Sequence, residues 1–131
     1  MSVLIEGRTI TSVGPDEQTP ALPGDWEVAC GGRLVTTGLV DCHTRLVGGS
    51  VTPWAGDLLL RSFTQRFDQE LAIEKTLTVG EVEALTAFSM ARALRQGVTM
   101  VAEHLHAPGC VGEALEAQAR AARRPGIRLL D

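Results

Sequence analysis

The apolar and polar positions of this chain change their period several times along its length. Residues 3–14, VLIEGRTITSVG, roughly alternate around Gly7, which predicts a β-hairpin or two short strands. Residues 15–25 hold three of the six prolines and predict a loop. Residues 26–30 predict another short strand, which a Gly-Gly pair ends. The first part of the chain is therefore expected to be a small β region.

Helical spacing of apolar residues is strongest over residues 78–96. Thr78, with Glu81 three positions on, matches a capping box, the arrangement that satisfies the first free N–H groups of a helix. Gly97 stands where helices commonly end in a left-handed residue. A second helix is predicted over residues 111–124, before a Pro-Gly pair.

Short apolar runs around these helices predict the strands of a parallel sheet. Residues 39–43 read as a strand buried on both faces, residues 98–102 as a second and residues 127–131 as a third. Residues 46–77 predict an excursion: a loop at a glycine pair, then partial helix from Asp57. Strands that alternate with helices imply βαβ units with right-handed crossovers. Five aromatic residues are expected in the core: Trp26, Trp54, Phe63, Phe67 and Phe88.

Polar residues gather where the first two predicted strands end, which is where parallel α/β sheets place their sites. We expect Asp41 to fix the strand-end loop by hydrogen bonds and Cys42 to be a small buried hydrophobe. Glu103 is a candidate ligand or base. The histidines of the two strand ends are His43, His104 and His106.

Composition narrows the class of protein. The net charge of −4 and the pI near 5.3 argue against a nucleic-acid-binding surface, which needs a basic stripe. The basic cluster near the C-terminus is interpreted as helix-end chemistry; it comprises Arg120, Arg123, Arg124 and Arg128. Three cysteines without a CxxC pair, no leader and no spanning apolar run predict a cytoplasmic protein with no membrane contact.

One segment resembles a known family. Residues 32–46, GRLVTTGLVDCHTRL, are similar to the amidohydrolase signature, in which a glycine, an apolar strand and Asp-x precede His-x-His. Residues 94–101, LRQGVTMV, look like that family's second barrel strand, and residues 103–108, EHLHAP, look like the deaminase and chlorohydrolase branch. The nearest resemblance is to aminohydrolases linked to selenium metabolism. Imidazolonepropionases, which carry Asp-Cys-His-Thr-His-Leu-Val, are the alternative.

The resemblance implies a fold and an activity. It implies α/β architecture: residues 1–36 as part of a small N-terminal β-sandwich domain, and residues 37–131 as the first two to three βα units of a TIM-like barrel. It also implies hydrolysis of a C–N bond, by deamination or aminohydrolysis, in a small cyclic substrate. The cofactor implied is a divalent metal, zinc first, because neutral imidazoles suit that ion and the ion activates water.

This sequence departs from the family pattern at a critical position. His43 matches the first metal-binding histidine, but Arg45 stands where the second is expected. Arginine stays protonated and has no lone pair for a metal. Thr37 also replaces the usual proline, and the remaining ligands of the family come from strands beyond Asp131. We therefore expect a truncated or degenerate hydrolase that is inactive alone.

The histidines allow two assignments. By resemblance, His43 is the metal position, whereas His104 and His106 lie on the substrate side. A compensating metal site built from all three histidines is the alternative.

Other functions stay open at this level. The chain could be a subunit whose incomplete sheet is covered by a second copy or by a partner chain, because an open sheet leaves an unpaired edge. It could be a non-catalytic binding module that reuses part of the fold. It could also be a piece of a longer protein, in which case further histidines would follow Asp131.

Overall fold

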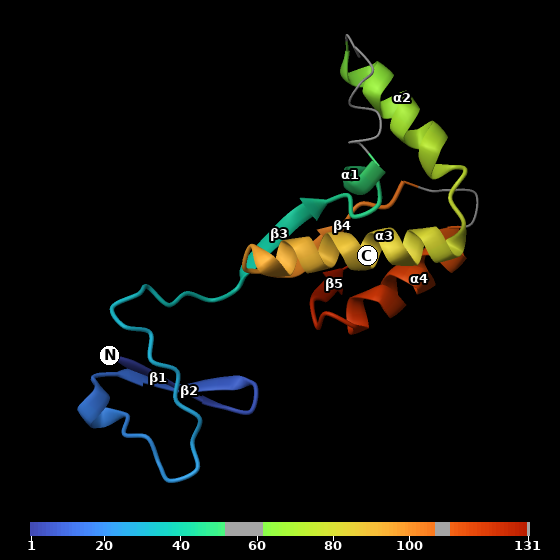
Figure 1. The fold of residues 1–131 in the computed structure, drawn as a ribbon. Helices are drawn as coiled ribbons and strands as arrows, with labels where there is room; N and C mark the ends of the chain where they lie inside the picture. Colours follow the sequence, from blue (N-terminus) through green and yellow to red (C-terminus); the bar gives the residue numbers. More distant parts are fainter. Residues whose placement is uncertain (52–61, 107–110, 131) are drawn as a thin grey trace. The chain divides into compact units, whose positions relative to one another are not determined.

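The computed structural model describes residues 1–51, 62–106 and 111–130 of the 131-residue chain. The chain divides into two compact units, residues 1–36 and residues 37–131 (Figure 1). Each unit is described by itself. Their assignment to a β-sandwich domain and to barrel units stays a prediction.

The first unit is built on the predicted hairpin. Strands β1 (Ser2–Glu6) and β2 (Thr9–Gly14) pair antiparallel, and the turn between them uses Gly7 with a φ of 61°. A left-handed φ of this kind costs glycine little, whereas a side chain would be strained there. The prediction of a hairpin is confirmed.

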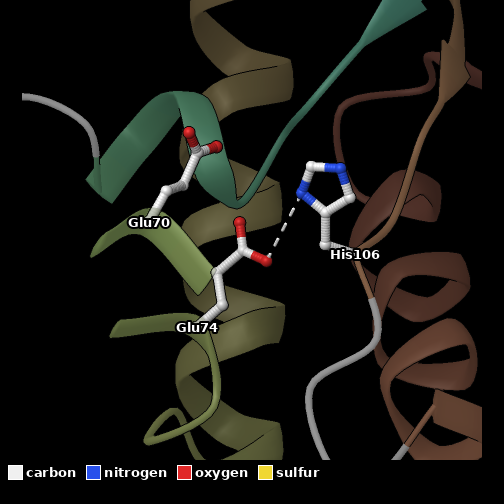
Figure 2. Close-up of side chains that lie close together, drawn as sticks. All are labelled: Glu70, Glu74 and His106. Carbon is white, nitrogen blue, oxygen red and sulfur yellow. Dashed lines mark ion pairs between the residues drawn. The ribbon is translucent and has the colours of Figure 1, made fainter. Parts of the chain in front are cut away.

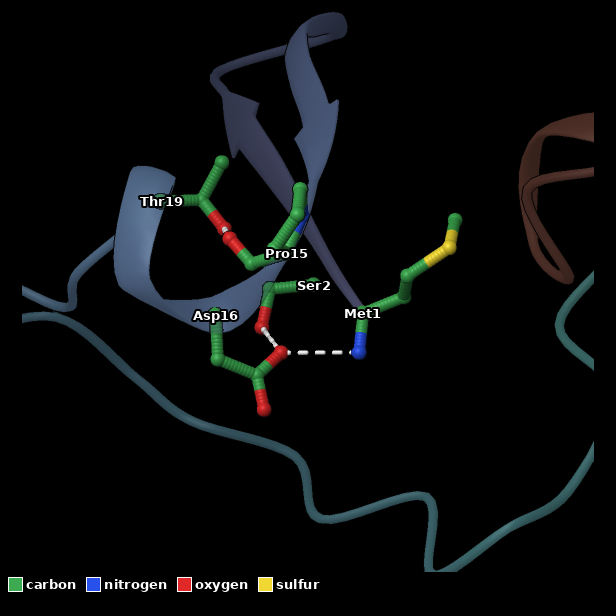
Figure 3. A network of polar contacts seen from close by, with 5 residues as sticks. All are labelled: Met1, Ser2, Pro15, Asp16 and Thr19. Atoms are coloured by element: carbon green, nitrogen blue, oxygen red, sulfur yellow. Dashed lines mark hydrogen bonds and ion pairs between the residues drawn. The ribbon is translucent and has the colours of Figure 1, made fainter.

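A short 3-10 turn, η1 (Asp16–Gln18), lies within the segment predicted as a loop. The Asp16 carboxylate accepts a hydrogen bond from Ser2 Oγ at 2.8 Å and pairs with the N-terminal amine at 2.9 Å (Figure 3). These contacts, the N-terminal one first, lower the pKa of Asp16. Thr19 Oγ1 donates to the Pro15 carbonyl at 3.2 Å, so both ends of the turn are tied by side chains.

The strand predicted over residues 26–30 is wrong. The segment pairs with no described strand, and the Trp26 side chain is 91% exposed. Its apolar residues therefore gain neither a hydrogen-bond ladder nor a buried face, which are what stabilise a strand. The assignment of Trp26 to the core is wrong for the same reason.

The second unit is a three-stranded parallel sheet with helical connections (Figure 1). Its strands lie in the order β3 (Leu39–Thr44), β4 (Val98–Glu103) and β5 (Arg128–Leu130). The predicted α/β class and the three strands predicted for this unit are confirmed, and the described strands of this sheet do not close into a barrel.

Two long helices connect these strands. Helix α3 (Val79–Arg95) begins with the predicted capping box of Thr78 and Glu81, and Gly97 follows its end with a φ of 84°. Helix α4 (Val111–Arg123) lies against α3, and Arg120 of α4 forms an ion pair with Glu83 of α3 at 3.2 Å. None of the described helices is long and apolar enough to cross a membrane.

The connecting segment between β3 and α3, predicted as an excursion, contains two described helices. Helix α1 (Gly48–Val51) replaces the loop predicted at the glycine pair, so that prediction is wrong for these residues. Helix α2 (Phe63–Glu74) confirms the partial helix, with Ser62 Oγ accepting from Gln65 N at 3.3 Å as its N-cap. The predictions for residues 52–61 and for Pro108-Gly109 lie outside the described residues.

The core lies between the sheet and the two long helices. Helix α3 buries Val82, Thr86 and Met90, which follow each other at intervals of four residues. Met90 packs with Val101 of β4 and with Ile127 in front of β5. This contact joins the helix to two neighbouring strands.

Several large apolar side chains of the sheet are open to solvent. Leu39, Val40 and Leu130 are each more than half exposed, so β3 is not the doubly buried strand expected from its composition. Cys42 is exposed as well, and its predicted burial is wrong. Phe63 and Phe88, expected in the core, are 74% and 57% exposed, because α2 and α3 turn other side chains inward.

We predict that Met90→Ala destabilises the second unit by about 2–5 kcal/mol, because it removes a fully buried side chain and leaves a cavity. The control Leu94→Ala, which truncates a side chain 40% exposed on the same helix, is expected to cost about 1 kcal/mol or less. Urea denaturation followed by circular dichroism measures both. Equal losses for the two variants would contradict this assignment of the core.

Candidate functional site

The structure brings the three predicted histidines together at the carboxyl ends of β3 and β4. The rings of His43 and His104 lie 5.4 Å apart between centroids, and those of His104 and His106 lie 5.0 Å apart. His43 and His104 are exposed, whereas the His106 side chain is only 10% exposed. Parallel strands that end at one edge explain this gathering of residues distant in sequence.

Arg45 follows β3 directly and is half-buried beside the histidines. Its guanidinium carbon lies 5.2 Å from the centre of the Phe67 ring, within the range of a cation–π contact. Its Nε is buried without a hydrogen-bond partner among the described residues. Because its guanidinium has no lone pair, His43 and Arg45 do not fit the family's metal-binding pair.

Helix α2 adds two buried carboxylates that the sequence analysis missed. Glu70 and Glu74 lie one helical turn apart and are 6% and 3% exposed. Glu74 Oε2 lies 3.9 Å from His106 Nδ1, the pair that the dashed line joins in Figure 2, and Glu70 lies beside them. Phe67 of the same helix meets the His106 ring edge-on, with 4.8 Å between centroids.

A signal for these glutamates is present in the sequence. Phe67, Glu70 and Glu74 follow at intervals of three and four residues, so they share one face of α2. A face that begins with an aromatic residue and continues with two glutamates departs from an ordinary apolar stripe. Glutamate is rarely fully buried unless it is paired, which makes such a face a candidate polar site.

Glu103, a candidate ligand or base from the sequence, makes hydrogen bonds that hold the strand ends together. Its Oε2 accepts the Leu46 backbone N–H at 2.9 Å, and its Oε1 accepts Gln118 Nε2 at 3.0 Å. These bonds tie the exit of β3 to the end of β4 and to α4. Glu103 is therefore a positioning residue of the strand-end loop.

Further hydrogen bonds fix the loop after β3. Asp41 Oδ1 accepts the His43 N–H at 3.1 Å, which confirms the predicted role of Asp41. Ser89 of α3 donates to the Leu46 carbonyl at 2.6 Å and also bonds with Ser50 of α1. The segment that carries His43 and Arg45 is thus held by strands and helices on several sides.

Gly48, the first residue of α1, lies against the two glutamates. A Cβ at this position would collide with the carboxylate oxygens of Glu70 and Glu74. The glycine therefore permits the close approach of α2 to the strand-end loop.

The surroundings shift the pKa values of Glu74 and His106 in opposite directions. Burial, followed by the negative charge of Glu70, raises the pKa of Glu74 to about 7, although Arg45 acts in the other direction. Burial, followed by the positive charge of Arg45, lowers the pKa of His106. The site therefore disfavours an ionised Glu74 and a charged His106 alike.

The arrangement has a defined chemical capacity. One ligand atom from each of Glu70, Glu74 and His106 can be chosen so that all three lie within 4.8 Å of one another. Two carboxylates and an imidazole can hold a proton or bind a divalent ion. In the part of the chain that the structure describes, this is the group with metal-ligand spacing, whereas the three histidines do not form one.

Comparisons with known proteins point to one group of enzymes. The chain is 31% identical over 136 residues to the imidazolonepropionase of Arthrobacter sp. (strain FB24), covering 93% of this chain and 30% of that protein. It is 34% identical over 97 residues to that of Rhizobium rhizogenes, covering 73% of this chain and 23% of the relative. A third match, to that of Bacillus thuringiensis (strain Al Hakam), is 48% identical over 50 residues, or 37% of this chain and 12% of the relative.

The chain spans less than a third of the length of these relatives. No family model matches it. The comparisons thus show a partial, distant similarity to imidazolonepropionase, a member of the amidohydrolase superfamily. The narrower branch expected from residues 103–108 stays a prediction.

We predict that Glu74→Gln removes a pH-dependent loss of stability. The folded-state pKa of Glu74, about 7, lies above its ordinary value of 4.5, so the folded state holds the proton more tightly. That contribution is complete below pH 4.5 and is lost as the pH rises through about 7, by roughly 3 kcal/mol at most. The variant is expected to be the more stable protein at pH 8.

The measurement is urea denaturation of metal-free protein with and without Glu74→Gln between pH 4 and pH 8. The two proteins are compared at each pH because His106 has the opposite effect. Its lowered pKa destabilises the folded protein as the pH falls. Glu113→Gln is the exposed control. A difference that does not change with pH would show that Glu74 is not confined as the structure has it.

Proposed function

We propose that this chain forms the first βα units of an amidohydrolase-type barrel and contributes to the hydrolysis of a C–N bond in a small cyclic substrate. The name of the similar enzymes makes an imidazolone the first substrate to consider. The chain does not catalyse the reaction alone, and it works in the cytoplasm.

The gathering of His43, His104 and His106 at the carboxyl ends of two adjacent parallel strands supports this proposal most directly. Active sites of barrel enzymes lie at this end of the strands. The similarity to imidazolonepropionases covers the same strands, because it extends over 93% of the chain in one relative.

The residues at the strand ends have different proposed roles. His104 is exposed and offers its ring to a substrate, and His106, whose ring lies 5.0 Å from that of His104, is the second substrate-side residue. Zinc is the cofactor that the resemblance implies, but the pair at positions 43 and 45 offers one ligand where the family has two. Arg45 is therefore the reason that we propose an inactive chain in isolation.

A partner is part of the proposal. Leu39, Val40 and Leu130 are each more than half exposed, and they leave apolar surface on the sheet that further strands and helices would cover. A second copy of the chain, or a chain that carries the later strands, would complete the sheet.

A non-catalytic binding module is the second candidate, and Arg45 favours it. A guanidinium with an unpartnered buried Nε beside two exposed imidazoles suits the binding of an anionic heterocycle without turnover.

A chimera tests the proposed function. This chain replaces the matching portion of the Arthrobacter imidazolonepropionase, with position 45 as Arg, His or Leu, and hydrolysis of imidazolonepropionate is measured with Zn²⁺ present. We expect Arg45→His to exceed the unaltered chimera by at least about 100-fold, because only histidine supplies the missing lone pair. Arg45→Leu, which removes the charge without adding a ligand, is expected to stay inactive.

Circular dichroism and native mass establish that the three chimeras fold and assemble alike. If all three are folded and equally inactive, the strands of this chain do not form part of such a hydrolase. If the isolated natural chain turns the substrate over, its proposed dependence on further strands is wrong.

A further inference from the structure

We infer that Glu70, Glu74 and His106 form a binding site for a divalent transition-metal ion, distinct from the position of His43 and Arg45. The two carboxylates come from α2, and the imidazole follows β4. The inference goes beyond the proposed function and does not depend on it, since it concerns ligands that the amidohydrolase signature does not include.

The geometry of the three side chains is close to that of a metal site. One ligand atom from each lies within 4.8 Å of the others, and Glu74 Oε2 and His106 Nδ1 are 3.9 Å apart. Ligands bound to one zinc at about 2.0–2.2 Å stand roughly 3.5 Å from one another. Small side-chain rotations would therefore bring all three onto a single ion.

The burial of these groups is the second, independent observation. The Glu74 side chain is 3% exposed and that of His106 is 10% exposed. Glu74 Oε2 and His106 Nδ1 are buried atoms without a hydrogen-bond partner in the described structure, and they face each other at 3.9 Å (Figure 2). Buried polar atoms are nearly always satisfied, so two unsatisfied atoms that face each other beside a further carboxylate indicate a missing partner.

The local charge favours a cation despite Arg45. The carboxylates of Glu70 and Glu103 act on Glu74 together with the single guanidinium of Arg45. Three carboxylates and one arginine leave two negative charges when all are ionised. A divalent ion balances that charge, and it replaces the need for a proton on Glu74.

The donor set selects the class of metal. One imidazole and two carboxylates combine nitrogen and oxygen ligands that zinc accepts, and three protein ligands would leave its fourth position open. Magnesium prefers oxygen ligands and keeps several waters, which the buried surroundings of Glu74 do not favour. Zn²⁺ is therefore the probe, and Mg²⁺ is the control ion.

Isothermal titration of the full chain with Zn²⁺ at pH 7.5 tests the site. We expect one ion per chain, and at least a 10-fold loss of affinity in each of Glu70→Gln, Glu74→Gln and His106→Gln. Glu83→Gln, which alters a carboxylate between α3 and α4, is expected to bind as the natural chain does. Mg²⁺ in equal amount is expected to leave Zn²⁺ binding unchanged.

Two further variants separate this site from the histidine cluster. His43→Gln and His104→Gln are expected to keep Zn²⁺ affinity within about 3-fold. If these two abolish binding while Glu70→Gln and Glu74→Gln do not, the ion lies among the histidines and the inference is wrong. No stoichiometric binding by the natural chain overturns it as well.

A thermal-shift measurement tests the same metal site in every variant that folds. The rise in thermal midpoint on adding Zn²⁺ is measured for every variant that folds, because an ion that binds only the folded state stabilises it. The shift is expected in the natural chain, His43→Gln and Glu83→Gln, and it is expected to be absent in at least two of the three ligand variants. A full shift in all folded ligand variants would overturn the inference.

Discussion

Two carboxylates held one helical turn apart in a buried place need a balancing charge or a proton, and this constraint acts on the whole strand-end region. Glu70 and Glu74 are almost fully buried on α2, with His106 facing Glu74 from the end of β4. Arg45 supplies part of the balance from the end of β3. Because charges in low dielectric are stable only when paired, the helix, the two strand ends and the arginine constrain one another.

The parallel sheet provides the frame for that arrangement. Glu103 holds the Leu46 backbone and Gln118, and Ser89 holds the Leu46 carbonyl, so the loop after β3 has little freedom. Gly48 then lets α2 approach that loop. These supporting residues thus help to keep the histidines and glutamates in a fixed relation.

Local patterns predicted most of the elements. The capping box at Thr78 and the hairpin around Gly7 depend on neighbours in sequence, and both are confirmed. Burial could not be predicted as well, because it depends on which elements pack together. Phe88 and Cys42 are exposed for this reason, and Trp26 is exposed because its segment pairs with no described strand.

The histidines could be predicted from the sequence because they directly follow short apolar runs that mark the strand ends. The burial of Glu70 and Glu74 could not, because it depends on the packing of α2 against a loop about twenty residues earlier.

The most direct test of a metal between Glu70, Glu74 and His106 is the histidine side-chain ¹⁵N spectrum with one equivalent of Zn²⁺. The account predicts a metal-bound Nδ1 on His106, with His43 and His104 unchanged. Binding on His43 or His104, with His106 unchanged, would contradict it.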